Sequence, residues 1–327
     1  MNQFEYVRLS DVTGAAKAIS KVANSQFLAG GTNLIDLIKM GITTPARLVD
    51  IKPLPLAMIS RTAGGITIGA IASNSQVAEH ADIKSMFPLL AMAINAGASP
   101  QLRNMATTGG NLMQRTRCPY FFDITMPCNK RAPGTGCGAL EGINRMHAIL
   151  GASDKCIAVN PSDMNVALAA LDATIEVTGA KGKRVIRIAD FHRLPGDHPE
   201  LDNTLAKGEL ITSVTIPASP FNKNYHYLKV RDRTSYAFAL VSAAVGLQMD
   251  GNTIRAARIA MGGVAHKPWR ATAAEKFLQG KTATDENFEK AGQLAIEGAH
   301  GYEHNKFKLK LAPNAVRQAL LTAAAKK

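Results

Sequence analysis

The chain has 327 residues, enough for two domains with buried cores. Hydrophobic residues make up 46% of it and charged residues 19%, a balance that excludes a disordered protein. There are 38 Lys and Arg against 25 Asp and Glu, a net charge of +13, and the excess is spread along the sequence. A basic surface favours acidic partners, phosphate-bearing ligands or nucleic acid, and composition alone does not choose among them.

The apolar segments of the chain do not indicate a membrane protein. Charged residues at positions 5, 8 and 11 interrupt the N-terminal region, so it lacks the apolar core of a signal peptide. The longest uncharged stretch, 85–102, contains two prolines and reads as a buried helix. We therefore expect a chain that is soluble by itself and has no membrane span.

The N-terminal part of the chain predicts alternating strands and helices, followed by a helical region and an irregular segment. The expected strands are 5–9, 26–29, 47–51 and 64–72, and the expected helices are one opened by Asp11 and those at 33–39, 74–80 and 86–97. Residues 104–117 are rich in glycine and threonine. Residues 118–156 are irregular, with many prolines and glycines.

The remaining chain predicts a helix, a hairpin and then a separate α+β unit. Ser162 or Asp163 opens a helix at 166–171, and strands follow at 174–178, 184–188 and 210–216. The Pro-rich stretch 217–224 is the expected boundary. After it we expect strands at 225–230, 241–249 and 253–262, with Gly251 in a turn, and helices at 271–278, 285–299 and 313–325. The predicted domains are 1–220 and 221–327.

Two glycine pairs are the first candidate for chemistry. They lie in Phe-Leu-Ala-Gly-Gly-Thr-Asn-Leu (27–34) and Ala-Thr-Thr-Gly-Gly-Asn-Leu (106–112). Successive glycines let backbone N–H groups approach an anion closely. Neither pair matches G-x-G-x-x-G, so a Rossmann nicotinamide site is unsupported, and each alone also fits an ordinary turn or polar loop. Two such turns about eighty residues apart favour one large phosphate-bearing ligand held from two sides.

The four cysteines are the second candidate, because all of them fall in the irregular segment: Cys118, Cys128, Cys137 and Cys156. None of their spacings matches the C-x2–4-C pairs of zinc modules, and disulfides would need an oxidising compartment. Long spacers rich in proline and glycine suit a bulkier cofactor with four cysteine ligands, an iron–sulfur cluster. Four basic neighbours would offset the charge of such a cluster: Arg115, Arg117, Lys130 and Arg131. Spacing alone leaves cluster, zinc and disulfide open.

Five motifs occur in an order that resembles a known family. They are GGTNL (30–34), TTGGN (107–111), PSD (161–163), GELI (208–211) and IAMGGVA (259–265), the last followed by Pro268 and Arg270. Together they resemble the FAD-binding subunit of the molybdenum hydroxylases, the xanthine dehydrogenase and aldehyde oxidoreductase family, along essentially the whole chain. The resemblance implies an α+β fold: a two-lobed PCMH-type FAD-binding domain and a C-terminal α+β domain of the CO dehydrogenase flavoprotein type.

The cysteine segment is similar to a loop found in one branch of that family. Residues 114–157 look like the loop that carries an extra [4Fe-4S] cluster in bacterial three-subunit aldehyde oxidoreductases. The benzoyl-CoA reductase branch also has such a loop. The resemblance implies that all four cysteines bind a [4Fe-4S] cluster.

The resemblance also implies which residues bind FAD. Those around the diphosphate would be Ala29, Gly30, Gly31, Thr32, Asn33, Leu34, Thr107, Gly110, Asn111 and Gln114. Asp163 would hydrogen-bond a sugar hydroxyl, and the backbone at Leu210 and Ile211 would hold the adenine end. Lys229 would lie near the flavin, where a cation stabilises the reduced, anionic form.

The implied function is electron transfer within a molybdenum-dependent aldehyde oxidoreductase. A large subunit with the molybdenum cofactor would oxidise the aldehyde, and a small subunit with [2Fe-2S] clusters would complete a heterotrimer. Electrons would leave through this chain to an external acceptor. The branch resembled here is periplasmic, by co-export with a signal-bearing partner, and a cytoplasmic location is the alternative.

Three alternatives remain at this point. The chain could be the FAD subunit of a benzoyl-CoA-type reductase or of another molybdenum hydroxylase, such as a xanthine or CO dehydrogenase. It could be a stand-alone FAD oxidase, although no motif places a His or carboxylate base near a flavin. A nucleic-acid-binding protein with a structural zinc is disfavoured, because no RNP-like or helix-turn-helix pattern occurs.

Overall fold

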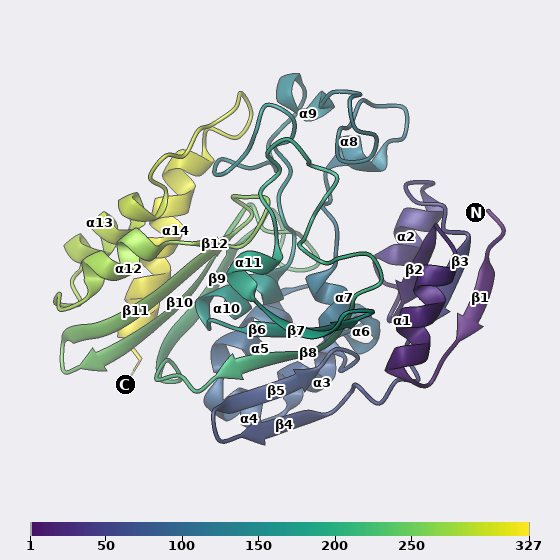
Figure 1. The fold of residues 1–327 in the computed structure, drawn as a ribbon. Coiled ribbons are helices and arrows are strands. Elements are labelled where there is room, and N and C mark those ends of the chain that lie inside the picture. Colours follow the sequence, from purple (N-terminus) through teal and green to yellow (C-terminus); the bar gives the residue numbers. More distant parts are fainter. Residues whose placement is uncertain (1, 327) are drawn as a thin grey trace.

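The computed structural model describes residues 2–326 and begins with a small lobe. Its parallel sheet has the order β1-β3-β2 and packs against two helices (Figure 1). The bounds are β1 Glu5–Arg8, α1 Val12–Lys21, β2 Ser25–Leu28, α2 Leu34–Lys39 and β3 Arg47–Asp50. Asp11 caps α1 because its carboxylate accepts a hydrogen bond of 2.6 Å from the Gly14 N–H. The predicted alternation of strands and helices is confirmed here.

A five-stranded antiparallel sheet follows, with the order β4-β5-β8-β6-β7. Its strands are β4 Ile59–Thr62, β5 Gly65–Gly69, β6 Thr174–Gly179, β7 Gly182–Arg187 and β8 Leu210–Pro217. The helices of this part are α3 Asn74–Glu79, α4 Ala81–Met86, α5 Pro88–Ala96, α6 Pro100–Met105, α7 Thr108–Leu112, α10 Asp163–Ala170 and α11 Ile188–Phe191. The buried faces of the sheet and of α3, α5 and α10 share one hydrophobic core.

The C-terminal part is a four-stranded antiparallel sheet with the order β12-β11-β10-β9. Its elements are β9 Asn224–Val230, β10 Val241–Asp250, β11 Thr253–Gly262, β12 Trp269–Arg270, α12 Thr272–Leu278, α13 Asp285–Ala295 and α14 Lys308–Ala324. The three helices cover one face of the sheet (Figure 1), and α5 and α10 contact β9, β10 and β11. Gly251 has φ +57° in the β10–β11 turn, as expected for a hairpin glycine.

The cysteine segment forms no sheet of its own. It contains two short helices, α8 Pro119–Phe122 and α9 Gly138–Glu141, and otherwise runs irregularly at the top of Figure 1, between the N-terminal lobe and the C-terminal helices. Isolated antiparallel bridges pair Cys128 with Cys137 and Ser153 with Cys156. Many contacts to neighbouring elements, described below, hold this segment in place.

Several element boundaries differ from expectation. The helix expected at 313–325 begins at Lys308, so Pro313 lies inside α14, and the helix expected at 285–299 ends at Ala295. Pro313 is the sixth residue of α14, so its ring removes one hydrogen bond within the helix, and the buried face of α14 that includes it still packs on the sheet. The elements β4, α4, α6 and α7 were not expected, since their segments are short and rich in turn-forming residues.

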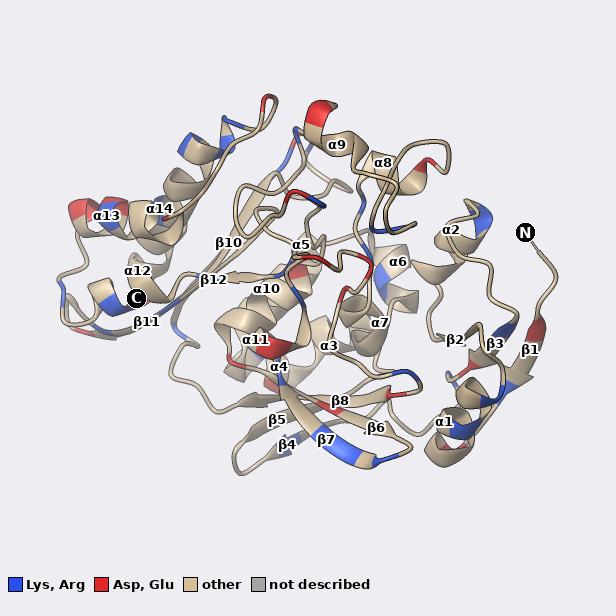
Figure 2. Ribbon diagram, turned by 45° about the horizontal axis from the view of Figure 1, so that its top comes forward, with Lys and Arg blue, Asp and Glu red and all other residues tan. Residues whose placement is uncertain are grey.

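Charged residues are distributed over the molecule without a single dominant cluster. Lys and Arg segments are interspersed with Asp and Glu over all parts of the fold (Figure 2), as the sequence indicated. Within residues 2–326, no helix combines the length and apolarity needed to cross a bilayer.

Candidate functional site

A cleft of about 1360 Å³ lies where the N-terminal lobe meets the rest of the molecule. All fourteen residues that the sequence analysis assigned to FAD line this one cleft, although they come from segments up to two hundred residues apart. The folding of the chain therefore brings both glycine turns, Asp163, the start of β8 and Lys229 together. The cleft is partly apolar and partly lined by backbone and hydroxyl groups, which is typical of cofactor sites.

The first glycine turn is shaped by close backbone packing. It joins β2 to α2, and a Cβ at Gly30 would lie 1.8 Å from the Met105 carbonyl oxygen. Gly31 has φ +74°, the left-handed region that side chains other than glycine rarely adopt. Only glycine therefore fits both positions. The result is a turn whose bare backbone faces the cleft, as a diphosphate-binding turn requires.

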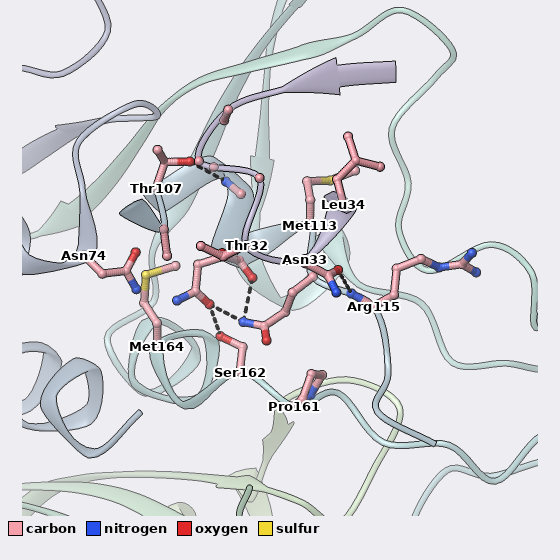
Figure 3. Close-up of a pocket in the computed structure, with 18 of the residues that line it drawn as sticks. Thr32, Asn33, Leu34, Asn74, Thr107, Met113, Arg115, Pro161, Ser162 and Met164 are labelled. Carbon is pink, nitrogen blue, oxygen red and sulfur yellow. Dashed lines mark hydrogen bonds between the residues drawn. The ribbon is translucent and has the colours of Figure 1, made fainter. Parts of the chain in front are cut away.

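The second glycine turn opens the short helix α7. Thr107 is its N-cap, and the side-chain hydroxyl accepts a hydrogen bond of 3.1 Å from the Gly110 N–H. Asn111 Oδ1 accepts from Gln114 Nε2 and from Ser162 Oγ, both at 2.6 Å. Figure 3 shows Thr107, Asn33 and Ser162 around the same cavity. These bonds hold the polar side chains of the cleft in fixed directions.

Asp163 and Lys229 form an ion pair in the wall of the cleft. Lys229 Nζ lies 2.8 Å from Asp163 Oδ2, and the Tyr227 hydroxyl donates to Asp163 Oδ1 at 2.6 Å. Burial, and then the Asp163 charge, raise the pKa of Tyr227 well above its usual value, so this hydroxyl remains a donor. The cation expected near the flavin is thus present in the cleft, but its charge is balanced by the residue expected on the sugar.

The sequence analysis missed an aromatic and basic rim on the cleft. Arg233, Tyr236 and Phe238 of the β9–β10 loop line it, and the Arg117 guanidinium lies 5.4 Å from the Phe238 ring centre. Tyr236 has φ +48°, unusual for a residue with a large side chain. No motif marks this loop. Its two arginines, followed by two aromatic residues within residues 231–238, were the only available signal.

The four cysteines are free thiols, and they lie close enough for the charge of one to shift the pKa of another. Burial raises the pKa of Cys118 to about 12, and Cys128 and Cys156 add to the shift. Burial also raises the pKa of Cys156 to about 11, although the charge of Lys130 opposes it, and Cys137 and Cys128 contribute further. Within residues 2–326, no three His, Cys, Asp or Glu side chains are grouped closely enough to hold a single metal ion.

A buried polar network ties the cysteine segment to the cleft. Asp202 accepts from Arg115 Nε at 2.6 Å and from Lys130 Nζ at 2.5 Å. Burial opposes ionisation, but the two cations prevail and lower the pKa of Asp202 to about 2. The Arg115 N–H donates to Asn33 Oδ1 at 2.9 Å, a contact visible in Figure 3. Arg115 therefore links the two candidate sites: its backbone bonds Asn33 of the cleft, and its side chain shares Asp202 with Lys130 of the cysteine segment.

The other basic neighbours of the cysteines also have partners. Arg117 lies 3.8 Å from the Asp36 carboxylate, and Arg131 donates to the carbonyl oxygens of Tyr120 and Phe121 at 2.8 Å. The four cations expected to offset a cluster's charge are thus largely engaged in holding the segment. Their positive charge nevertheless remains beside the thiols.

A histidine missed by sequence reasoning touches the cysteine site. His147 Nε2 lies 3.1 Å from Cys118 Sγ. Burial, with a contribution from Lys308, lowers the pKa of His147 to about 4, so the ring is neutral at physiological pH. No local spacing marks this residue, because Cys118 is 29 positions away in the sequence.

Two family models match the chain in succession. The FAD binding domain in molybdopterin dehydrogenase matches residues 2–219, and the CO dehydrogenase flavoprotein C-terminal domain matches residues 225–323. The chain is 48% identical to the aldehyde oxidoreductase FAD-binding subunit PaoB of Escherichia coli (strain K12), with 99% of each chain covered. It is 30% identical to the glyceraldehyde dehydrogenase medium chain of Sulfolobus acidocaldarius, over 87% of this chain and 84% of that one.

Solved structures have the same fold over nearly the whole length. A carbon monoxide dehydrogenase from Hydrogenophaga pseudoflava matches with a TM-score of 0.78 at 25% identity, covering 99% of this chain and 98% of that one. Quinoline 2-oxidoreductase from Pseudomonas putida 86 matches with a TM-score of 0.77, also at 25% identity, covering 99% and 97%. The expected fold class is thereby confirmed. The chain belongs to the FAD-binding oxidoreductase subunits of the molybdenum hydroxylase family.

Proposed function

We propose that this chain is the FAD- and [4Fe-4S]-carrying electron-transfer subunit of a molybdenum-dependent aldehyde oxidoreductase. In this proposal residues 1–220 form the domain that holds both groups, and residues 221–327 form the second domain. One observation carries the proposal: the segment 107–118 lines the large cleft for most of its length and ends in the first of four converging cysteines. The 48% identity to an aldehyde oxidoreductase FAD-binding subunit supports the substrate class.

The cleft residues fit FAD. The bare backbone of the Gly30–Gly31 turn would bind one side of the diphosphate, and the α7 turn with Thr107 would bind the other. FAD, when bound, supplies a carrier that exchanges one or two electrons. The ion pair of Asp163 and Lys229 would hold a fixed dipole in the cleft wall, and the neighbouring aromatic rim would exclude water.

The cysteine donor set fits an iron–sulfur cluster. Each thiolate of a [4Fe-4S] cluster binds a different iron, so the four sulfurs stand farther apart than around a single ion. Such a cluster, when bound, supplies a one-electron carrier. Cys118, Cys128, Cys137 and Cys156 would be its ligands, and Lys130 favours the Cys156 thiolate that binding requires.

Relatives named as medium chains of larger enzymes support the expected partners. We include in the proposal a large subunit with the molybdenum cofactor, a small subunit with [2Fe-2S] clusters, and an external electron acceptor. Residence in the periplasm, by export together with a signal-bearing partner, is also part of it. Its support is the resemblance of the cysteine segment to exported enzymes, and cell fractionation tests it.

Anaerobic co-purification with flavin and metal analysis tests the proposal. We expect one FAD and about four iron atoms per chain, together with molybdenum from the partner. Cys128→Ser should remove the iron and leave FAD bound. Met126→Ser is the matched control, because Met126 is exposed in the same loop and should keep both.

Each part of the proposal has its own contrary result. A colourless protein contradicts FAD binding. Wild-type protein with flavin but no iron contradicts the cluster and leaves the FAD subunit intact. Aldehyde turnover by the isolated chain, without partners, would favour the stand-alone oxidase.

A further inference from the structure

The contact between His147 and Cys118 is the closest approach of any ring nitrogen to a cysteine among the described residues. The Nε2–Sγ distance of 3.1 Å is within hydrogen-bonding range for sulfur; His147 is buried and Cys118 is half-buried. The ring of Tyr120 lies beside the imidazole, 6.2 Å between centres. The pair therefore forms a largely enclosed contact on one side of the cysteine site.

The backbone of His147 is held firmly by the start of α14. Its carbonyl oxygen accepts from Lys308 Nζ at 2.9 Å and from Asn305 Nδ2 at 3.3 Å. Its N–H donates to the Asn144 carbonyl oxygen at 3.0 Å. Lys308 is fully buried and also donates to the Gly263 carbonyl oxygen at 2.7 Å. Residues more than 150 positions away in the sequence thus fix where the ring points.

The ring's single N–H has one suitable acceptor when Cys118 is a thiolate. Nδ1 is buried and makes no hydrogen bond of normal geometry in the described structure. The nearby Asn144 carbonyl oxygen already accepts from the backbone N–H of His147, so an N–H at Nδ1 would be poorly satisfied. A ligating thiolate is an acceptor only. A proton on Nε2 leaves Nδ1 without an unsatisfied N–H and gives the Cys118 thiolate a donor. In the metal-free chain, the Cys118 S–H can donate to Nε2 instead. The tautomer with the proton on Nε2 therefore accompanies metal ligation.

We propose that His147 is a positioning residue that donates its Nε2–H to the Cys118 thiolate and thereby raises the reduction potential of the bound cluster. This inference rests on the proposed function. One-electron reduction adds one negative charge to a cluster that is already anionic. A hydrogen bond to a ligating sulfur stabilises that added charge, so the bond stabilises the reduced cluster more than the oxidised cluster.

A redox titration of the cluster, followed by electron paramagnetic resonance in the intact complex with dithionite as reductant, tests the proposal. His147→Leu removes the donor and should shift the midpoint potential downward, with iron and FAD contents unchanged. His147→Gln places an amide N–H near the same position and should restore most of the shift. His192→Leu is the control, because His192 is also buried but bonds the Leu112 carbonyl oxygen instead of a cysteine.

The outcomes separate this inference from the function on which it rests. Equal potentials in wild type and His147→Leu, at full iron content, would overturn it. Loss of iron in both His147 variants would overturn it too, because it would make the ring essential for holding the metal. Wild-type protein without iron would instead contradict the cluster itself.

Discussion

The FAD cleft and the cysteine segment are built in opposite ways. The cleft is made by the ends of regular elements, where β2, α6, α7 and α10 bring bare backbone and capped turns together. The cysteine segment has almost no regular structure and is held by side chains that bond distant backbone, among them Lys130, Arg131 and Lys308. The cleft should therefore be sensitive to changes of shape, and the cysteine segment to changes of charge.

Gly30→Ala should have the largest effect, on the cleft. The new Cβ would meet the Met105 carbonyl oxygen at 1.8 Å, so backbone must move. We expect a loss of about 3 kcal/mol or more in the free energy of unfolding and loss of most bound FAD, because overpacked backbone does not relax easily. Flavin absorbance and chemical denaturation measure both.

Gly64→Ala is the control for this change, since no atom lies within 4 Å of the Cβ position there. It should keep FAD and change the stability by less than about 0.5 kcal/mol. Normal FAD content in Gly30→Ala would show that the cleft tolerates a change of shape, which would contradict the contrast drawn between the cleft and the cysteine segment.

Lys130→Met should affect the cysteine segment instead. It removes a buried cation from Asp202, which keeps Arg115 as a partner, so we expect a loss of about 2 kcal/mol. Iron should be lost with it, because Lys130 favours the Cys156 thiolate, while FAD should remain. Arg317→Met, in an exposed pair with Asp285, should leave the stability nearly unchanged and keep the iron. Iron retention in Lys130→Met would contradict a charge-dependent segment.

The stability of the metal-free chain at acid pH should depend on the same network of Asp202, Lys130 and Arg115. The folded-state pKa of Asp202 is about 2, below the unfolded value of about 3.9, so its stabilising contribution is present above pH 4. That contribution, about 1–2 kcal/mol for this partly exposed carboxylate, should fall as the pH drops from about 4 to about 2. Asp202→Asn should flatten the curve in this window, as measured by urea denaturation. An unchanged curve would show that Asp202 does not contribute to the pH dependence of stability.

Thr107→Ala should have the smallest effect and should be confined to the cleft. Loss of the α7 cap costs about 1 kcal/mol and loosens the second glycine turn, so FAD should dissociate several-fold faster. Thr284→Ala removes an equivalent cap from α13, away from the cleft, and should cost about the same without affecting FAD. Equal flavin release in the two variants would show that the cap acts only through stability.

The same contrast explains what the sequence could predict. The glycine turns are local signals, and a positive φ or a close backbone contact demands glycine wherever it occurs. Three of the four strands of the C-terminal sheet also followed from local patterns, whereas β12 was not expected and the fold class came from the resemblance to a family. The helices α6 and α7 did not follow from local patterns, because both are short and depend on tertiary contacts, α6 with α3 and α7 with β5 and β8.

Pairings between distant residues were outside the reach of sequence reasoning. The partner of Lys229 is Asp163, 66 positions away, so a balanced ion pair could not be distinguished from a free cation. The start of α14 was placed at Pro313, a common first position in helices. The true start at Lys308 depends on buried bonds to His147 and Gly263, which no local pattern contains.

The attachment of the cysteine segment to α14 has an evolutionary consequence. A relative that lost the segment would leave the amide of residue 305 buried without its acceptors at 147 and 148, and the ammonium of residue 308 with only one of its two acceptors. Gain or loss of the four cysteines should therefore be accompanied by substitution at these two positions. We expect chains of this family without the cysteines to carry apolar or small side chains there. The residue types at these two positions would then indicate whether a chain has the cysteine segment, although the segment is far away in the sequence.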